Sequence, residues 1–167
     1  MQLLYKWLFD WPERTARHLT WLPPLFARFT LGWVFMWTGW AKLNNLPSMI
    51  ENFTSWNIPF PTILTPFVSG LEFVGGAFLL AGFLTRITSG ALGVTMIVAI
   101  IAAYWEEIDS LETLLGLSET AYIALFFYLA IAGSGKLSVD EWLRRRVGGV
   151  STQDPSAVLN AASSQSA

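Results

Sequence analysis

The chain has 167 residues, of which 53% are hydrophobic and only 13% are charged. An ordinary soluble domain carries about 25% charged residues, so this composition is typical of a membrane protein with one domain. The net charge is −2, and no basic region suggests nucleic acid as a partner. Cysteine is absent and His18 is the only histidine. We therefore expect no metal or haem within this chain, because it lacks thiolates and a pair of histidine ligands.

The first 23 residues combine tryptophans with charged side chains. Lys6 and Asp10 interrupt the apolar run, and no obvious small-residue cleavage site follows it, so the segment does not resemble a secretory signal. Trp7, Trp11 and Trp21 are typical of a segment that lies at a membrane surface. We expect residues 1–23 to form an interfacial segment on the cytoplasmic face.

Four apolar segments are long enough to cross the hydrocarbon core, which takes about 20 helical residues. They cover residues 24–43, 61–84, 87–105 and 114–133, and either Pro61 or Pro66 suits the first turn of the second helix. The fourth segment must extend back past Glu119, since its purely apolar part begins only at Ala121. The sequence thus predicts an all-α fold, an integral membrane four-helix transmembrane bundle over residues 24–146.

Basic and acidic residues occupy different connections between these spans. The connection "EEIDSLE" between the third and fourth spans is acidic. Basic residues occur before the first span, between the second and third, and after the fourth: Lys6, Arg14, Arg17, Arg86, Lys136, Arg144, Arg145 and Arg146. Because positive residues stay inside, both termini are predicted to be cytoplasmic. Residues 147–167 are small and polar, and we expect a disordered tail.

Charged side chains recur at the same spacing on the first two spans. Arg28 and Lys42 are 14 residues apart, as are Glu72 and Arg86, which corresponds to about 21 Å along a helix. If the two helices are antiparallel neighbours, Lys42 comes level with Glu72, and Arg28 comes level with Arg86. A buried Glu72 is then tolerable either as an ion pair with Lys42 or in its protonated form.

The paired arginines at the cytoplasmic boundary require an anion. Asp140 is the favoured partner, because the turn "GSGKLSV" returns the chain to that boundary. Glu141, a lipid phosphate and a carboxylate of another protein are alternatives. Asp140 is equally suited to be a plain N-cap of the helix that follows it.

Glu72 and Lys42 are the main candidates for a catalytic site. An ionisable residue inside a membrane is a functional candidate by default, here for handling protons or binding a quinone, although the pair can also simply tie two helices together. Gly75 and Gly76 share the face of Glu72 and would admit a flat ring or, more commonly, a neighbouring helix. Glu119 and Tyr122 are weaker candidates for binding a cofactor, with an interfacial position as the alternative for both.

Three segments together resemble the DoxX family of small four-helix membrane proteins. They are "ARFTLGWVFMWTGWAKL", "LEFVGGAFLLAGFLTR" and "GSGKLSVDEWLRRR". The last is similar to the family's Gly-x-Gly-(Arg/Lys)-x-Ser-x-Asp signature, with Lys136 where many relatives carry Arg. The resemblance covers about residues 25–146. It implies the bacterial inner membrane and association with quinone-linked redox enzymes.

The resulting prediction is a small accessory subunit of a quinone-linked redox complex, with a polar intramembrane site near Glu72 and Lys42. Quinone is the expected cofactor, and any redox activity would belong to the complex as a whole. The alternative is a non-catalytic membrane anchor or assembly factor for a soluble redox or peptide-modifying enzyme. Membrane lipids and either a protein partner or a second copy of the chain are the expected contacts.

Overall fold

The fold comes from a computed structural model that describes residues 19–135 and 137–148. The described residues form α-helices with no strand, as the sequence predicts, together with a π-helical and a 3-10 segment. The α-helices are α3 (Leu22–Asn44), α4 (Leu46–Ser55), α5 (Pro61–Ala81), α6 (Thr85–Ala99), α7 (Leu111–Gly116), α8 (Ser118–Ala132) and α9 (Val139–Gly148). The expected interfacial segment falls mostly on residues 1–18 and the expected tail mostly on 149–167, which lie outside the described residues.

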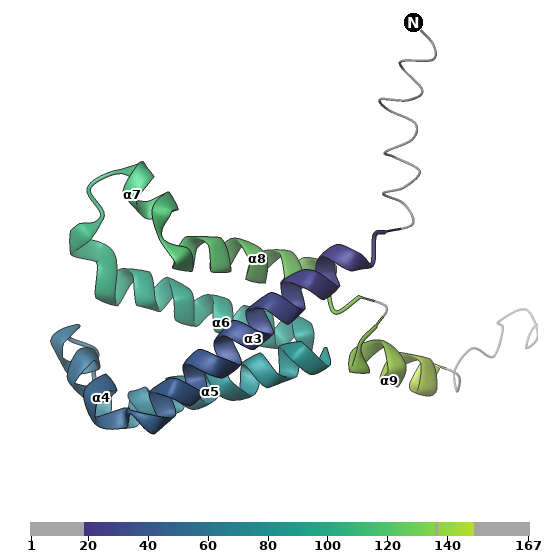
Figure 1. Cartoon of the computed structure of the whole chain (residues 1–167), viewed down its shortest axis with the longest axis horizontal. Coiled ribbons are helices and arrows are strands. Elements are labelled where there is room, and N and C mark those ends of the chain that lie inside the picture. The colour runs from purple at the N-terminus through teal and green to yellow at the C-terminus, as the bar shows by residue number, and fades with distance from the viewer. Residues whose placement is uncertain (1–18, 136, 149–167) are drawn as a thin grey trace, which may run out of the picture.

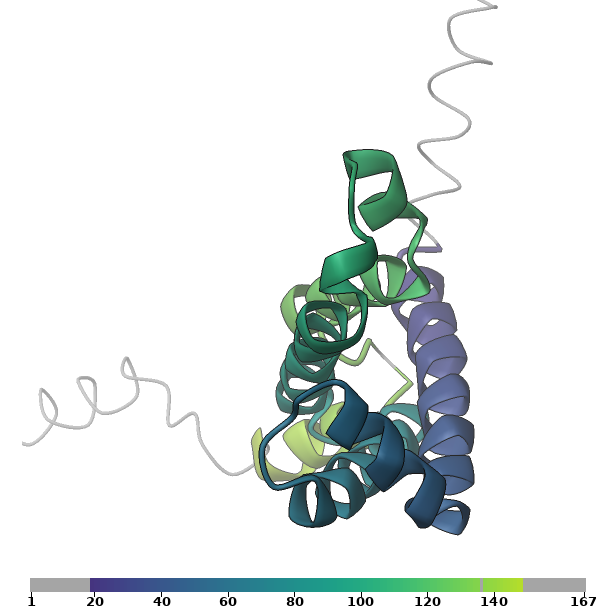
Figure 2. The ribbon, with the colours of Figure 1, turned by 90° about the vertical axis from the view of Figure 1, so that its left-hand side faces the viewer.

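Helices α3, α5, α6 and α8 form the body of the molecule and run in alternating directions (Figures 1 and 2). Contacts join α3 to α5, α5 to α6, α6 to α8 and α8 back to α3. Helices α4 and α7 lie at one end of this body, and α9 lies at the other (Figure 1). We refer to these as the α4/α7 end and the α9 end.

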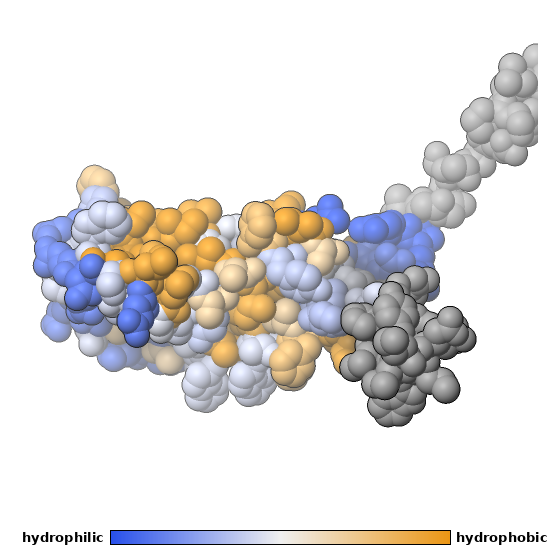
Figure 3. All heavy atoms as spheres, turned by 90° about the horizontal axis from the view of Figure 1, so that it is seen from above, coloured by the Kyte–Doolittle hydropathy of each residue, from blue (hydrophilic) through white to orange (hydrophobic). Residues whose placement is uncertain are grey.

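Two of these helices are long and apolar enough to cross a membrane: Pro61–Ala81, and α6 with its extension to Glu107. Helix α8 is apolar but shorter. Apolar residues gather over the middle of the body, and hydrophilic residues lie at both ends (Figure 3). On α3 the side chains of Trp33, Trp37 and Trp40 are exposed, whereas Arg28 and Gly39 on the opposite side are buried.

The expected fourth span is not one continuous helix. Helix α7 ends at Gly116, Leu117 is extended with ψ 137°, and α8 begins at Ser118. Glycine is a poor helix former, and the hydroxyl of Thr120 donates a hydrogen bond to the Leu114 carbonyl across the break. Glu119 therefore lies in the first turn of α8 and not inside a longer helix.

Glycines bring the backbones of α3 and α5 into direct contact. A Cβ atom on Gly39 would overlap the backbone nitrogen of Phe73, and one on Gly76 would overlap the backbone nitrogen of Met36. Gly75 faces a different neighbour, the side chain of Leu92 on α6, which would lie 3.2 Å from an added Cβ. Close packing of helices thus accounts for both residues of the glycine pair.

An apolar core fills the middle of the body. Its buried members come from all four long helices: Ala27, Leu31, Phe35, Leu79, Leu92, Met96, Phe126 and Leu129. The rings of Phe35 and Phe126 meet edge to face, with centroids 4.9 Å apart. We call these eight residues the core cluster.

At the α9 end, Arg28 holds the segment between α8 and α9 against α3. Its side chain is 4% exposed. The guanidinium donates hydrogen bonds to the carbonyl oxygens of Ser134 (2.6 Å) and Leu137 (2.7 Å). Arg86 donates to the Ile131 carbonyl at 3.3 Å. Carbonyls at and after a helix C-terminus lack helical partners and carry partial negative charge. Backbone carbonyls thus bind the two arginines where an anion was predicted.

Asp140 binds backbone groups of another helix, and its charge also interacts electrostatically with Arg28 without forming a direct ion pair. Its carboxylate accepts hydrogen bonds from the backbone nitrogens of Leu84 (2.7 Å) and Thr85 (3.1 Å), at the start of α6. Its own backbone nitrogen donates to the Gly82 carbonyl at 3.0 Å. Among the described residues no ion pair joins Asp140 to Arg28 or Arg86. The carboxylate satisfies free N–H groups at a helix N-terminus, which is a favourable position for a negative charge.

Replacing Gly76 with Ala is expected to lower the free energy of unfolding by about 1–3 kcal/mol, because the new methyl group forces two helix backbones apart. Gly70→Ala on the same helix is the matched control, since an added Cβ there meets no atom within 4 Å. Thermal unfolding in one detergent measures both variants. Equal melting temperatures for the two variants would show that the α3–α5 contact is not as close as described.

Replacing Asp140 with Ala is expected to destabilise the protein by about 0.5–2 kcal/mol, because two N–H groups at the start of α6 lose their acceptor. Glu141→Ala is the control, since Glu141 pairs only with the exposed Arg144 and Arg145 among the described residues. Such surface pairs contribute about 0–1 kcal/mol. The same unfolding measurement applies, and a larger loss for Glu141→Ala would contradict the role given to Asp140.

Candidate functional site

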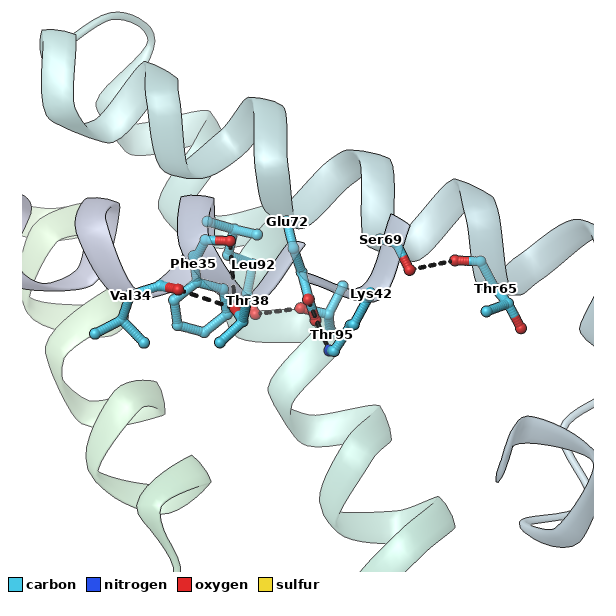
Figure 4. A network of polar contacts seen from close by, with 9 residues as sticks. All are labelled: Val34, Phe35, Thr38, Lys42, Thr65, Ser69, Glu72, Leu92 and Thr95. Atoms are coloured by element: carbon cyan, nitrogen blue, oxygen red, sulfur yellow. Dashed lines mark hydrogen bonds and ion pairs between the residues drawn. The ribbon is translucent and has the colours of Figure 1, made fainter. Parts of the chain in front are cut away.

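Lys42 and the buried Glu72 form an ion pair between α3 and α5. The Lys42 Nζ atom lies 2.7 Å from both carboxylate oxygens of Glu72. The Glu72 side chain is 2% exposed and that of Lys42 is 33% exposed. Lys42 belongs to the last turn of α3, where a positive charge is favoured by the helix dipole. The contact expected from the 14-residue spacing is therefore present in the structure (Figure 4).

Hydroxyl groups near this pair bind carbonyls of their own helices. Thr38, one turn before Lys42, donates to Val34 at 3.0 Å, and Thr95 on α6 donates to Leu92 at 2.7 Å (Figure 4). Within the described part of the chain, Lys42 alone donates hydrogen bonds to the Glu72 carboxylate. A carboxylate accepts about four hydrogen bonds and an ammonium donates three, so the pair retains capacity for a ligand.

The ion pair forms part of the wall of a cavity of about 550 Å³ at the α4/α7 end. Its wall is formed by Lys42 of α3, by residues of α4, α5 and α6 with its π-helical extension, and by Glu119 at the start of α8. Apart from Lys42 and Glu72, its polar side chains are Thr95, Tyr104 and Glu119. The remaining wall is apolar and includes Met49, Phe53, Trp56, Phe67, Val68 and Met96. A concave, mostly apolar space of this size with a few polar groups is typical of a small-molecule site.

Two features of the cavity were not predicted from the sequence. Helix α4 supplies Met49 and Phe53, and Trp56 follows directly after it, whereas the sequence predicted no helix between residues 43 and 61. Pro47 at the start of α4 and the spacing of Met49 and Phe53 are the signals that would have indicated a short helix there. The second feature is the π-helical segment Ile100–Tyr104, which lines the cavity with Tyr104. Such segments are rare in proteins, but those that occur are often at functional sites. No residue pattern in the sequence predicts this one.

Of the four weaker candidates for cofactor binding, Glu119 lines the cavity and the other three do not. Tyr122 packs edge to face on Phe35 with ring centroids 5.5 Å apart, beside the core cluster. Gly75 and Gly76 are buried against Leu92 and Met36, as described above. The proposed anion cluster of Arg28, Arg86 and Asp140 lies at the α9 end, away from this cavity.

The core cluster separates the cavity from the α9 end. Along α3, Phe35 and Leu31 lie between Lys42 and Arg28; along α5, Leu79 lies between Glu72 and Gly82. Along α6, Leu92 lies between Thr95 and the buried Ser89 and Thr85. Helices α3 and α6 therefore carry polar side chains on both sides of an apolar layer, and on α5 this layer lies between Glu72 and the glycine that ends the helix.

The chemistry available at the cavity is that of a carboxylate and an ammonium in apolar surroundings. Within residues 19–135 and 137–148, no group of three or more His, Asp or Glu side chains is placed to hold a metal ion. The pair can offer N–H donors from Lys42 and acceptor oxygens from Glu72 to the same ligand. The apolar wall suits the lipophilic part of that ligand.

Comparison with known proteins identifies the family. The model of the DoxX family matches residues 24–105. The "Inner membrane protein YqjF" of Escherichia coli (strain K12) is 30% identical over 125 residues, which cover 73% of this chain and 92% of that protein. The "Putative oxidoreductase CatD" of Bacillus subtilis (strain 168) is 27% identical over 121 residues, or 71% and 85% of the two chains. No solved structure gives a significant match.

These similarities confirm the resemblance to the DoxX family, and the part matched by the family model contains the two segments around Arg28 and Glu72. They also agree with the apolar surface of the folded body and with its two helices long enough to span a bilayer. The chain is a membrane protein and belongs to the DoxX family.

Proposed function

We propose that this protein is a small accessory subunit of a quinone-linked redox complex in the bacterial inner membrane, and that it binds the quinone in the cavity at the α4/α7 end. The observation that carries the proposal is the buried Lys42–Glu72 pair in the wall of an otherwise mostly apolar cavity of about 550 Å³. The name of the similar Bacillus subtilis protein, "Putative oxidoreductase CatD", points in the same direction.

The proposal includes a topology in which α3, α5, α6 and α8 all cross the membrane. The α9 end would face the cytoplasm, because α9 carries Arg144, Arg145 and Arg146. The α4/α7 end would face outside, because its connections are acidic, with Glu106, Glu107, Asp109 and Glu112. This arrangement follows the rule that positive residues remain on the cytoplasmic side. Exposed apolar side chains on all four helices support it.

The polar groups of a quinone and its reduced form match the pair. A quinone carbonyl would accept a hydrogen bond from the Lys42 ammonium, and a hydroquinone hydroxyl would donate one to the Glu72 carboxylate. On oxidation of the hydroquinone, two electrons would pass to a redox centre of the partner enzyme. Glu72 would accept one of the two released protons, and the other would pass to the water that reaches the exposed part of Lys42. The isoprenoid chain would lie against the apolar wall formed by residues such as Phe53 and Phe67.

A second candidate function is a non-catalytic membrane anchor or assembly factor. The observation that favours it is the exposed aromatic stripe of α3, formed by Phe26, Phe29, Trp33, Trp37 and Trp40. These side chains lie opposite the α5 contact and would pack against a transmembrane helix of a partner. A partner that co-purifies with the chain while the cavity holds no quinone would favour this function.

Replacing Glu72 with Gln is expected to lower the amount of quinone retained by the purified complex at least tenfold and to abolish quinone-linked turnover, because the amide cannot titrate. The double variant Glu72→Gln, Lys42→Gln leaves no unpaired charge, so it is expected to insert and fold normally but to remain inactive. Quinone content, turnover and the quantity of inserted protein are measured together.

Glu51→Gln is the matched control for these variants, because Glu51 is exposed on α4 and does not line the cavity. It should retain wild-type quinone content and turnover. Normal turnover in a correctly inserted Glu72→Gln protein would refute the quinone site and leave the pair as a structural tie between α3 and α5.

Single cysteines test the proposed topology without interference, since the sequence contains no cysteine. Cysteine at Ser55 or Ser110, both exposed at the α4/α7 end, is expected to react with a membrane-impermeant thiol reagent in intact cells whose outer barrier has been made permeable. Cysteine at Ser164, in the part of the chain outside the described residues, should react only after the inner membrane is opened. External labelling at Ser164 would reverse or refute the orientation.

A further inference from the structure

We propose that the α9 end carries a separate binding site for the head group of one anionic phospholipid. A cavity of about 600 Å³ lies there between the start of α6, the end of α8 and α9. Arg86 and Arg144 line it from two different helices, together with the turn residues Gly133 and Ser134. This cavity shares no lining residue with the one at the α4/α7 end, so the proposal does not depend on the quinone site.

Both arginines keep hydrogen-bond donors available for a phosphate. A guanidinium has five N–H donors. Arg86 is exposed and makes one recorded hydrogen bond, at 3.3 Å, to the Ile131 carbonyl. The Arg144 side chain is 75% exposed, and its nearest recorded carboxylate oxygen, of Glu141, is 3.8 Å away. Paired guanidinium groups are well suited to the oxygens of a phosphate.

A glycine leaves room for the Arg86 side chain. Gly133 has φ 80°, which favours glycine, and a Cβ atom there would lie 3.3 Å from Arg86 Nε. Any side chain at this position would crowd the guanidinium where it passes over the turn. The backbone that ends α8 thus keeps Arg86 beside the cavity.

The two carboxylates that also line this cavity have partners of their own. Asp140 accepts hydrogen bonds from the Leu84 and Thr85 backbone nitrogens. Glu141 is 3.0 Å from Arg145 Nε. The N-terminus of α6 offsets part of the charge of Asp140, and Arg145 offsets part of the charge of Glu141. The unused hydrogen-bond donors in the cavity wall are those of Arg86 and Arg144.

The surroundings favour a phospholipid over a soluble phosphate. Ile87 lines the cavity and is 70% exposed, and Ile131 on the adjacent turn of α8 is 62% exposed. Both continue into the apolar surface of α6 and α8, along which acyl chains would run. On α9 the exposed Trp142 lies under Arg146, with the guanidinium carbon 4.2 Å from the ring centroid, a combination typical of a membrane interface. A phosphate with attached acyl chains thus matches both parts of the site.

Titration of the full-length protein in mild detergent with dioctanoyl phosphatidylglycerol tests this proposal. Native mass spectrometry counts bound lipid, and the melting temperature is recorded in parallel, since a ligand that binds only the folded state raises it. We expect one tightly held lipid, and at least tenfold weaker binding for the variant Arg86→Gln, Arg144→Gln. Arg146→Gln is the matched control, because it removes the same charge from α9 without touching the cavity wall, and it should change binding less than twofold.

Three results would overturn the proposal. Equal binding of dioctanoyl phosphatidylcholine would show that the site does not select a net negative lipid. Displacement of the lipid by equimolar inorganic phosphate would show that the acyl chains contribute nothing. A loss for Arg146→Gln as large as that for the double variant would indicate diffuse attraction by surface charge. Circular dichroism establishes that each variant is folded before its binding is compared.

Discussion

The close contact between α3 and α5 is the constraint on which the rest of the structure depends. Gly39 and Gly76 allow the two backbones to touch, and that proximity lets Lys42 reach both carboxylate oxygens of Glu72. Removing Lys42 would leave the charge of the buried Glu72 without a partner, which is destabilising. The ion pair therefore depends on the glycines. Without the close helix contact, neither α3 nor α5 could keep its charged side chain inside the body of the molecule.

The two ends of the molecule use charge in different ways. At the α9 end, Arg28 and Asp140 bind backbone groups, so each charge fixes a turn or a helix end in place. At the α4/α7 end, Lys42 and Glu72 bind each other beside a cavity, and neither is used to hold backbone. Side chains that hydrogen-bond backbone groups in this way stabilise the fold and have fewer donors or acceptors left for a ligand. Charges that contact only each other keep hydrogen-bonding capacity for a ligand, and this contrast is why the quinone site is proposed at the α4/α7 end.

Helical periodicity was sufficient to predict the Lys42–Glu72 contact, because equal spacing on two antiparallel helices fixes which residues come level. It could not assign partners that depend on the turn geometry between distant segments. Asp140 finds the N–H groups at the start of α6 only because Leu84, with φ 48°, folds that turn toward it. The apolar pattern also does not predict local backbone conformation. It therefore missed the break at Leu117, the π-helical segment Ile100–Tyr104 and the helix over residues 46–55.

The buried pair also restricts which ligands the proposed site can accept. A ligand that draws Lys42 away must supply a donor to Glu72, because a buried carboxylate left without a partner is costly. A fatty acid offers its carboxylate to Lys42 but repels Glu72, and a hydrocarbon satisfies neither group. A hydroquinone hydroxyl can donate to Glu72 while its oxygen accepts from Lys42, so both ions remain paired throughout binding. The requirement for a donor and an acceptor on one lipophilic molecule follows from the 2% exposure of Glu72, and it is the physical reason for preferring a hydroquinone, the reduced form of a quinone, to other lipids of similar size.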